Sequence, residues 1–270
     1  MSAFFENTSP LALVVIAIAF TWILALAGAS VVFFFKKINL KILDIMLGFS
    51  AGVMISASLW SLLLPAYNMA TDFGVEGWIP TVFGFLLGAL FLFAIDRLLP
   101  HLHPGLAFDK AEGINSGLQR SILLVLAVTL HNIPVGLAVG VAFGALAHGG
   151  TASIGGAIAL AVGIGIQNFP EGLAVAVSLR REGLSRIKSF FYALCSGFVE
   201  PLAGILGALA VIFIEPILPY ALSFAAGAMI FLVVEELIPE AQNSGNTDLA
   251  TIGSIFGFAL MMFLDFIFAG

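Results

Sequence analysis

The chain has 270 residues, of which 61% are hydrophobic and only 10% are charged. A soluble domain averages about half apolar and about a quarter charged residues. The mean hydropathy of +1.13 therefore excludes a soluble fold and indicates an integral membrane protein. The formal net charge of −6 favours no nucleic-acid partner, and the single Cys195 excludes an internal disulfide.

Apolar stretches long enough to cross a bilayer, which takes about 20 helical residues, occur eight times. We therefore predict an all-α polytopic membrane protein in which residues 1–270 form one transmembrane domain. Helices one to three are expected within 10–99, helices four and five within 121–179, and helices six to eight within 189–268. The predicted spans are 10–35, 42–66, 77–99, 121–147, 154–179, 189–214, 217–239 and 249–268.

The basic residues gather in three connections, which follow the first, third and fifth spans. With eight spans, these connections all lie on the same side of the membrane. Cytoplasmic loops carry an excess of Lys and Arg, so we expect these loops in the cytoplasm and both termini outside, in a bacterial inner membrane. The basic residues are Lys36, Lys37, Lys41, Arg97, Lys110, Arg120, Arg180, Arg181, Arg186 and Lys188.

Three pairs of segments resemble each other and indicate internal repeats. FSAGVMI at 49–55 matches FAAGAMI at 224–230, and HNIPVGLAV at 131–139 matches QNFPEGLAV at 167–175. In the predicted topology, the members of each pair cross the membrane in opposite directions, which is typical of inverted-repeat transporters. The third pair consists of Gly84, Gly88 and Asp96 in one span, and Gly253, Gly257 and Asp265 in the other.

Polar residues and prolines interrupt the fourth and fifth spans at matching positions. Gln167 and Glu171 are four residues apart and share one helical face. Each proline frees the carbonyl four residues earlier, and such a group is tolerated in a membrane only where protein, water or an ion satisfies it. The residues are His131, Asn132, Pro134, Gln167, Asn168, Pro170 and Glu171.

Acidic side chains lie in spans that contain no Lys or Arg. By insertion scales, a charged residue at the helix centre costs about 2.5–3.5 kcal/mol, so these acids must be protonated, hydrated or bound to a cation. Imidazole beside amide and carboxylate ligands suits zinc, iron, copper or nickel. Met54, which repeats as Met229, could add a thioether ligand. The acids are Glu171, Glu200, Glu235, Glu236 and Glu240.

Three functions fit these observations: a carrier of zinc-like metals, a membrane-embedded metalloenzyme, and a non-transporting metal sensor. The enzyme is disfavoured because the His-Glu-x-x-His motif is absent, and no G-x-x-x-x-G-K-[ST] loop indicates ATP coupling. We therefore expect neither enzymatic activity nor a prosthetic group. His101 and His103 could capture a metal ion at the exit, or they could belong to an ordinary loop.

At these residues the sequence resembles the ZIP (Zrt/Irt-like) family of divalent metal transporters, in particular its bacterial branch. The resemblance implies eight helices arranged 3+2+3, a two-metal site in helices four and five, metal transport toward the cytoplasm, and commonly a homodimer. It also implies an elevator-like slide of helices one, four, five and six. The motifs are GFSAGVM at 48–54, HNIPVGLAVG at 131–140, QNFPEGLAVA at 167–176, SGFVEPLAG at 196–204, FAAGAMIFLVVEELIPE at 224–240 and GFALMMFLD at 257–265.

The resemblance implies a first metal site, a second metal site and an exit residue, Glu236. Zinc is the expected ion, with cadmium, iron or manganese as further candidates. The first site would comprise Met54, His131, Gln167 and Glu171, and the second Asn132, Asn168, Glu171 and Glu200.

Val135 departs from the family pattern, because it replaces a glutamate that would bridge two metal ions. Asn168 also stands where an acid or a His-Asn pair is usual. With fewer carboxylates, the site attracts a dication less strongly. We therefore expect a site that holds one ion with lower affinity and depends on Glu171. Val135 is also consistent with a different substrate, with a loss of transport activity or with an engineered substitution.

Overall fold

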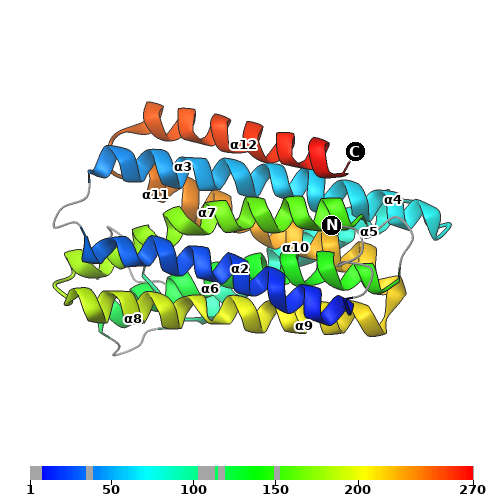
Figure 1. The fold of residues 1–270 in the computed structure, drawn as a ribbon, viewed down its shortest axis with the longest axis horizontal. Helices are drawn as coiled ribbons and strands as arrows, with labels where there is room; N and C mark the ends of the chain where they lie inside the picture. Colours follow the sequence, from blue (N-terminus) through cyan, green and yellow to red (C-terminus); the bar gives the residue numbers. More distant parts are fainter. Residues whose placement is uncertain (1–7, 35–38, 103–112, 115–118, 149–152, 270) are drawn as a thin grey trace.

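The computed structural model describes residues 8–34, 39–102, 113–114, 119–148 and 153–269. These residues are almost entirely helical (Figure 1). The helices are α2 (Pro10–Ser30), η1 (Val31–Phe33), α3 (Leu40–Ala57), η2 (Ser58–Leu63), α4 (Leu64–Asp72), α5 (Trp78–Leu98), α6 (Arg120–Gly144), η4 (Ala145–Ala147), α7 (Ile154–Arg181), α8 (Arg186–Gly197), α9 (Val199–Phe213), η5 (Glu215–Ile217), α10 (Leu218–Leu232), η6 (Val233–Leu237), α11 (Ile238–Gln242) and α12 (Thr247–Ala269).

Eight helical segments within the described residues are long and apolar enough to cross a membrane, which confirms the predicted number of spans. Their ends differ from the prediction because hydropathy detects only the part of a helix that suits lipid. The second span continues to Asp72 instead of 66, since α4 extends it beyond the apolar stretch. The sixth begins at Arg186 instead of 189, where the Ser185 side chain caps the first turn of α8.

Two spans contain a turn of π-helix at equivalent positions of the repeat. These turns are η2 in the second span and η6 in the seventh. Such turns frequently occur at functional sites, because they re-aim the side chains that follow them. The η6 turn contains Glu235 and Glu236, so it presents acidic side chains at the end of α10.

Four pairs of helices make the most extensive contacts: α2 with α7, α6 with α9, α3 with α12, and α5 with α10. Figure 1 shows α3 beside α12, and α2 between α7 and the α8–α9 segment. Every one of these pairs joins spans that are not neighbours in the chain. The first two pairs consist of spans one, four, five and six, and the last two consist of the other four spans.

Equivalent glycines of the repeat make equivalent close contacts. A Cβ atom on Gly257 of α12 would collide with the carbonyl oxygen of Phe49 in α3. A Cβ atom on Gly88 of α5 would collide in the same way with the carbonyl oxygen of Phe224 in α10. Small residues allow membrane helices to approach backbone to backbone. The repeated sequence therefore produces repeated packing, which supports the inverted-repeat prediction.

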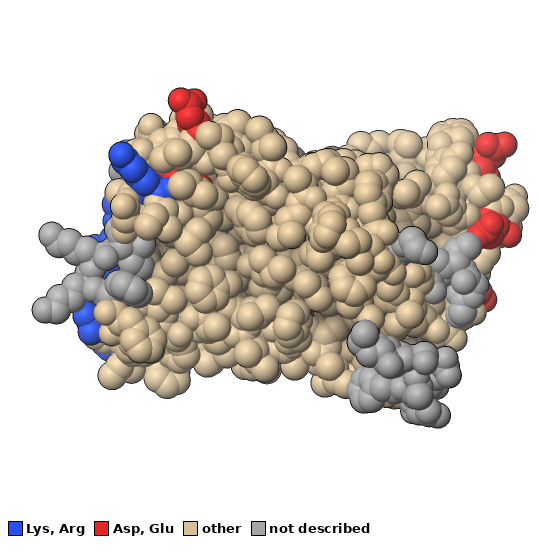
Figure 2. All heavy atoms as spheres, turned by 45° about the horizontal axis from the view of Figure 1, so that its top comes forward, with Lys and Arg blue, Asp and Glu red and all other residues tan. Residues whose placement is uncertain are grey.

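The two ends of the helical bundle differ in charge. On the face shown in Figure 2, the Lys and Arg side chains lie at the left end of the molecule. The first turn of α2 and the last turn of α12 lie at the opposite end (Figure 1). The start of α2 and the end of α12 therefore lie at the end of the bundle opposite to the basic residues. The eight-span topology predicts this arrangement.

We predict that Gly257→Ala and Gly88→Ala destabilise the protein to a similar extent. An added methyl group in a packed interface typically costs about 1–3 kcal/mol, and here it must displace backbone. Thermal unfolding in detergent, followed by the loss of monodisperse protein, measures the effect. Ile255→Ala, at a mostly lipid-exposed position of the same α12, is the control, and equal melting temperatures for all these variants would contradict the prediction.

Candidate metal site

The polar cluster lies where α6 and α7 each contain an internal proline, Pro134 and Pro170. The backbone beside one of these prolines is satisfied across the helix interface. The Ser50 hydroxyl of α3 donates a hydrogen bond to the Gln167 carbonyl, three residues before Pro170, over 3.0 Å. The Ser50 hydroxyl therefore ties α3 to α7 in the turn that precedes Pro170, next to the Ile166 carbonyl that this proline frees.

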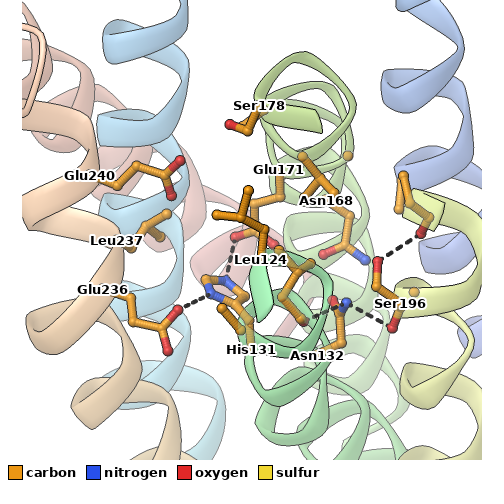
Figure 3. A pocket seen from close by; sticks show the side chains of 18 of the residues that line it. Leu124, His131, Asn132, Asn168, Glu171, Ser178, Ser196, Glu236, Leu237 and Glu240 are labelled. Carbon is orange, nitrogen blue, oxygen red and sulfur yellow. Dashed lines mark hydrogen bonds and ion pairs between the residues drawn. The ribbon is translucent and has the colours of Figure 1, made fainter. Parts of the chain in front are cut away.

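His131 lies at the centre of the cluster, between two carboxylates from different helices (Figure 3). Its Nε2 atom is 3.2 Å from Oε1 of Glu171 on α7. Its Nδ1 atom is 3.8 Å from Oε2 of Glu236 on η6. His131 and Glu171 are buried, with 8% of each residue exposed. The structure thus brings together three of the predicted residues, from three separate spans.

Among the described residues, three buried polar atoms of the first predicted site make no hydrogen bond of regular geometry, and two of them face each other in the His131–Glu171 ion pair. They are Nε2 of His131, Oε1 of Gln167 and Oε1 of Glu171. A buried polar atom without a partner costs free energy of about 1–3 kcal/mol, and native structures rarely contain one without a reason. Imidazole nitrogen, amide oxygen and carboxylate oxygen are the donor atoms that a borderline divalent ion accepts.

Apart from Glu171, which both predicted sites share, the residues of the second predicted site bond to one another or to backbone. Nδ2 of Asn132 donates to the carbonyls of Val128 and Ser196 over 3.0 and 3.3 Å. Nδ2 of Asn168 lies 3.0 Å from each carboxylate oxygen of Glu200. These polar atoms have protein partners, in contrast to those of the first predicted site.

Thr21 is a member of the cluster that the sequence analysis missed. Its hydroxyl lies 2.6 Å from Oε1 of Glu200, and the residue is fully buried. The signal available in the sequence was weak: one threonine, 179 positions from its partner, in a first span whose other hydroxyl residue is Ser30.

Met54 and Val135 are fully buried in the hydrophobic core. Neither belongs to the lining of the cavity that His131 and Glu171 border. The part of the chain that the structure describes also contains no group of three His, Cys, Asp or Glu side chains placed to hold a metal ion. A complete coordination sphere therefore needs amide oxygen, thioether sulfur or water beside His131 and Glu171.

A cavity of about 50 Å³ borders His131, Asn132, Glu171 and Glu236, which is room for a few water molecules. A larger cavity of about 440 Å³ adjoins it, and the two share Glu240 among their lining residues. Asp44 and Arg181 also line the larger cavity. Because Arg181 belongs to the basic end of the bundle, the cluster opens toward that end.

His101 lies in the connection after α5 and is fully buried. Its Nε2 atom is 3.0 Å from Oδ1 of Asp96, and its Nδ1 atom is 2.9 Å from the Leu99 carbonyl. Both partners accept hydrogen bonds, so they favour the doubly protonated ring. His101 therefore ties its loop to α5. The other histidine of the predicted pair, His103, lies outside the described residues.

The fold and this cluster define a polytopic membrane protein with buried metal-ligand groups, and comparisons with known proteins identify its family. A family model described as "ZIP Zinc transporter" matches residues 107–265. Zinc transporter ZIP11 of Homo sapiens is 42% identical, over 91% of this chain and 94% of that protein. Zinc transporter GufA of Myxococcus xanthus is 40% identical, over 76% and 79%. Zinc transporter ZIPB of Bordetella bronchiseptica is 36% identical, over 88% and 75%.

The chain belongs to the ZIP zinc transporter family. The resemblance inferred from the sequence is thereby confirmed. The relatives include bacterial proteins, as expected, and also animal ZIP11 proteins at higher identity than the Bordetella protein. Membership in a family of zinc transporters supports metal transport across the membrane as the class of activity.

We predict that the His101–Asp96 ion pair stabilises the protein at neutral and acidic pH. Burial lowers the pKa of His101, but the hydrogen bonds to Asp96 and to the Leu99 carbonyl and the charge of Asp96 outweigh it and raise the pKa from 6.5 to about 9. A group whose pKa is raised on folding stabilises fully below its unfolded value, here 6.5, and this contribution disappears as the pH rises through about 9.

Thermal unfolding of the parent and of His101→Asn over this pH range measures the effect. The difference in melting temperature should be largest at acidic pH and should vanish above the raised pKa. Asp96→Asn, which removes the partner carboxylate, should lose stability over the same range. A difference that does not change with pH would show that the ion pair is not its source.

Proposed function

We propose that this protein carries divalent zinc-like ions across the membrane, toward the cytoplasm, through a site between α6 and α7. The observation that carries the proposal is that buried ligand atoms of His131, Gln167 and Glu171 make no hydrogen bond of regular geometry with any described group, while His131 and Glu171 form an ion pair. Of these residues, His131 and Glu171 border a cavity that leads toward the basic end of the bundle. Zinc is the principal ion, and cadmium, iron and manganese are further candidate substrates.

The basic end of the bundle is the cytoplasmic end in this proposal, and both termini lie outside, in a bacterial inner membrane. The bias of Lys and Arg toward cytoplasmic loops supports this orientation. The ion then leaves the His131–Glu171 contact past Glu236 and Glu240 into the larger cavity. Acidic side chains along this route offer the ion successive weak partners, which favours release rather than tight retention.

Alternating access would come from sliding spans one, four, five and six against the other four. The packing supports this division, because α2 packs with α7 and α6 with α9 on one side, and α3 with α12 and α5 with α10 on the other. Each pair is held by close backbone contact and would move as a unit. We further propose the 3+2+3 arrangement and a homodimer, as the family resemblance implies.

The site holds a single ion in this proposal. Val135 supplies no carboxylate to bridge a second ion, and the amide of Asn168 bonds to both oxygens of Glu200. Glu171 is the sole carboxylate that α6 and α7 contribute, so it provides most of the attraction for a dication.

We predict that Glu171→Gln lowers zinc uptake by at least about tenfold, since replacing even outer groups of a metal site costs about 10–100-fold. Uptake of zinc, cadmium, iron and manganese into liposomes that contain the purified protein measures the effect. Glu215→Gln, which removes a half-exposed carboxylate from η5, is the matched control. Uptake by Glu171→Gln equal to that of this control would refute the site.

We predict that Val135→Glu raises zinc affinity about tenfold, or about 1.4 kcal/mol, which lies within the attraction of opposite charges a few ångströms apart. Equilibrium zinc binding to purified protein gives the affinity and the number of ions per chain. Val135→Gln has nearly the same shape without the charge and should not show the gain. Two zinc ions bound to the parent chain would refute the single-ion site.

A further inference from the structure

A chain of hydrogen bonds connects the first span to the side-chain amide nitrogen of Gln167. It runs from Thr21 on α2 to Glu200 on α9, then to Asn168 and Gln167 on α7. Thr21, Gln167 and Glu200 are fully buried, and Asn168 is 1% exposed. Water therefore has little access to the chain, and each group must find its partner among the others.

The direction of this chain is determined at its Thr21 end. The backbone carbonyl of Thr21 can only accept a hydrogen bond, and Nδ2 of Asn168 donates to it over 3.2 Å. The same nitrogen faces both carboxylate oxygens of Glu200, at 3.0 Å each. The amide nitrogen of Asn168 is thus held on this side, and its oxygen must point the other way, toward Gln167.

The orientation of Asn168 in turn decides which atom of the Gln167 amide is bonded and which is left available to a ligand. Oδ1 of Asn168 accepts a hydrogen bond from Nε2 of Gln167 over 2.6 Å. Because its nitrogen is held there, Gln167 turns Oε1 away, and this oxygen is buried without a partner. The opposite orientation would direct amide hydrogens toward the metal ion and repel it.

The Thr21 hydroxyl holds the other end of the chain in place. It lies 2.6 Å from Oε1 of Glu200 and 3.0 Å from the Ile18 carbonyl. Oε1 of Glu200 thus meets both Thr21 and Asn168, while Oε2 meets Asn168. Both carboxylate oxygens have hydrogen-bond donors, so the geometry uses Glu200 as an acceptor that anchors Asn168.

We propose that Thr21 is a positioning residue, which acts through Glu200 and Asn168 to hold Oε1 of Gln167 toward the transported ion. This role rests on the proposed metal site between α6 and α7. It also gives Asn168 and Glu200 a function other than binding a second ion. In metal sites, groups that orient a ligand typically contribute about 10–100-fold to metal affinity.

The test compares zinc binding and zinc uptake by the purified full-length chain and its Thr21→Val variant. The variant removes the hydroxyl and keeps the shape of the side chain. We expect zinc affinity to fall about tenfold and the KM for uptake to rise by the same factor, at little change in maximal rate. The visible absorption spectrum of bound cobalt should change, because one oxygen ligand is no longer held. Thr21→Ser, which restores the hydroxyl, should return all three properties.

Thr129→Val is the matched control. Among the described residues, its hydroxyl bonds to the Val125 carbonyl of its own helix α6, over 2.8 Å, and to no other group, so removing it should affect neither zinc affinity nor the cobalt spectrum. If Thr21→Val left zinc affinity and the cobalt spectrum unchanged, as this control should, the positioning role would be overturned. The positioning role would also be overturned if the parent bound two zinc ions and Thr21→Val bound one, because Glu200 would then be a ligand of the second ion.

Gln167→Glu provides a test that a general loss of stability cannot imitate. A glutamate presents an oxygen whichever way its carboxylate turns, so its metal affinity no longer depends on Asn168 and Thr21. Adding Thr21→Val to Gln167→Glu should therefore change zinc affinity less than about twofold, compared with about tenfold in the parent. Equal losses in both backgrounds would mean that Thr21 acts on folding alone. Glu171→Gln, measured in parallel, reports separately on the metal site itself.

Discussion

A carboxylate and an imidazole lie inside this membrane protein with no Lys or Arg in the cavity that they border. Lipid offers no water to satisfy such groups, so they need partners within the protein or an ion to bind. His131 and Glu171 contact each other, yet their facing atoms lack hydrogen-bond geometry with any described group. The surrounding helices keep this pair buried and connect it to a polar cavity.

Close packing of helices holds the pair in place. The prolines of α6 and α7 occur beside polar residues, and glycines two residues further along each helix allow α2 and α9 to approach. A Cβ on Gly172 would collide with the Ala25 carbonyl, and one on Gly136 with that of Glu200. The same contact that brings α9 against α6 therefore brings Glu200 near the metal site. Packing and polar chemistry depend on the same small residues here.

The residues expected to hold two metal ions fall into two groups in the structure. His131, Gln167 and Glu171 retain ligand atoms that make no regular hydrogen bond with any described group, whereas Asn168 and Glu200 are bonded to each other. The amide at position 168 explains the difference, because an amide donates a hydrogen bond to a carboxylate where an acid would repel it. Asn168 stands at a position that would suit a metal ligand, and in this chain it supports a neighbouring ligand instead.

The sequence by itself determined the eight spans, the gathering of basic residues at one end, the internal repeats and the polar cluster of α6 and α7. These properties follow from hydropathy, from helical spacing and from residue identity, which are local. Only the tertiary structure decided that Thr21 meets Glu200 across 179 positions, that His101 folds back onto Asp96, and that the second set of polar residues pairs internally. Hydrogen bonds between distant helices depend on how each helix is rotated and how closely it packs, and no local pattern in the chain specifies either.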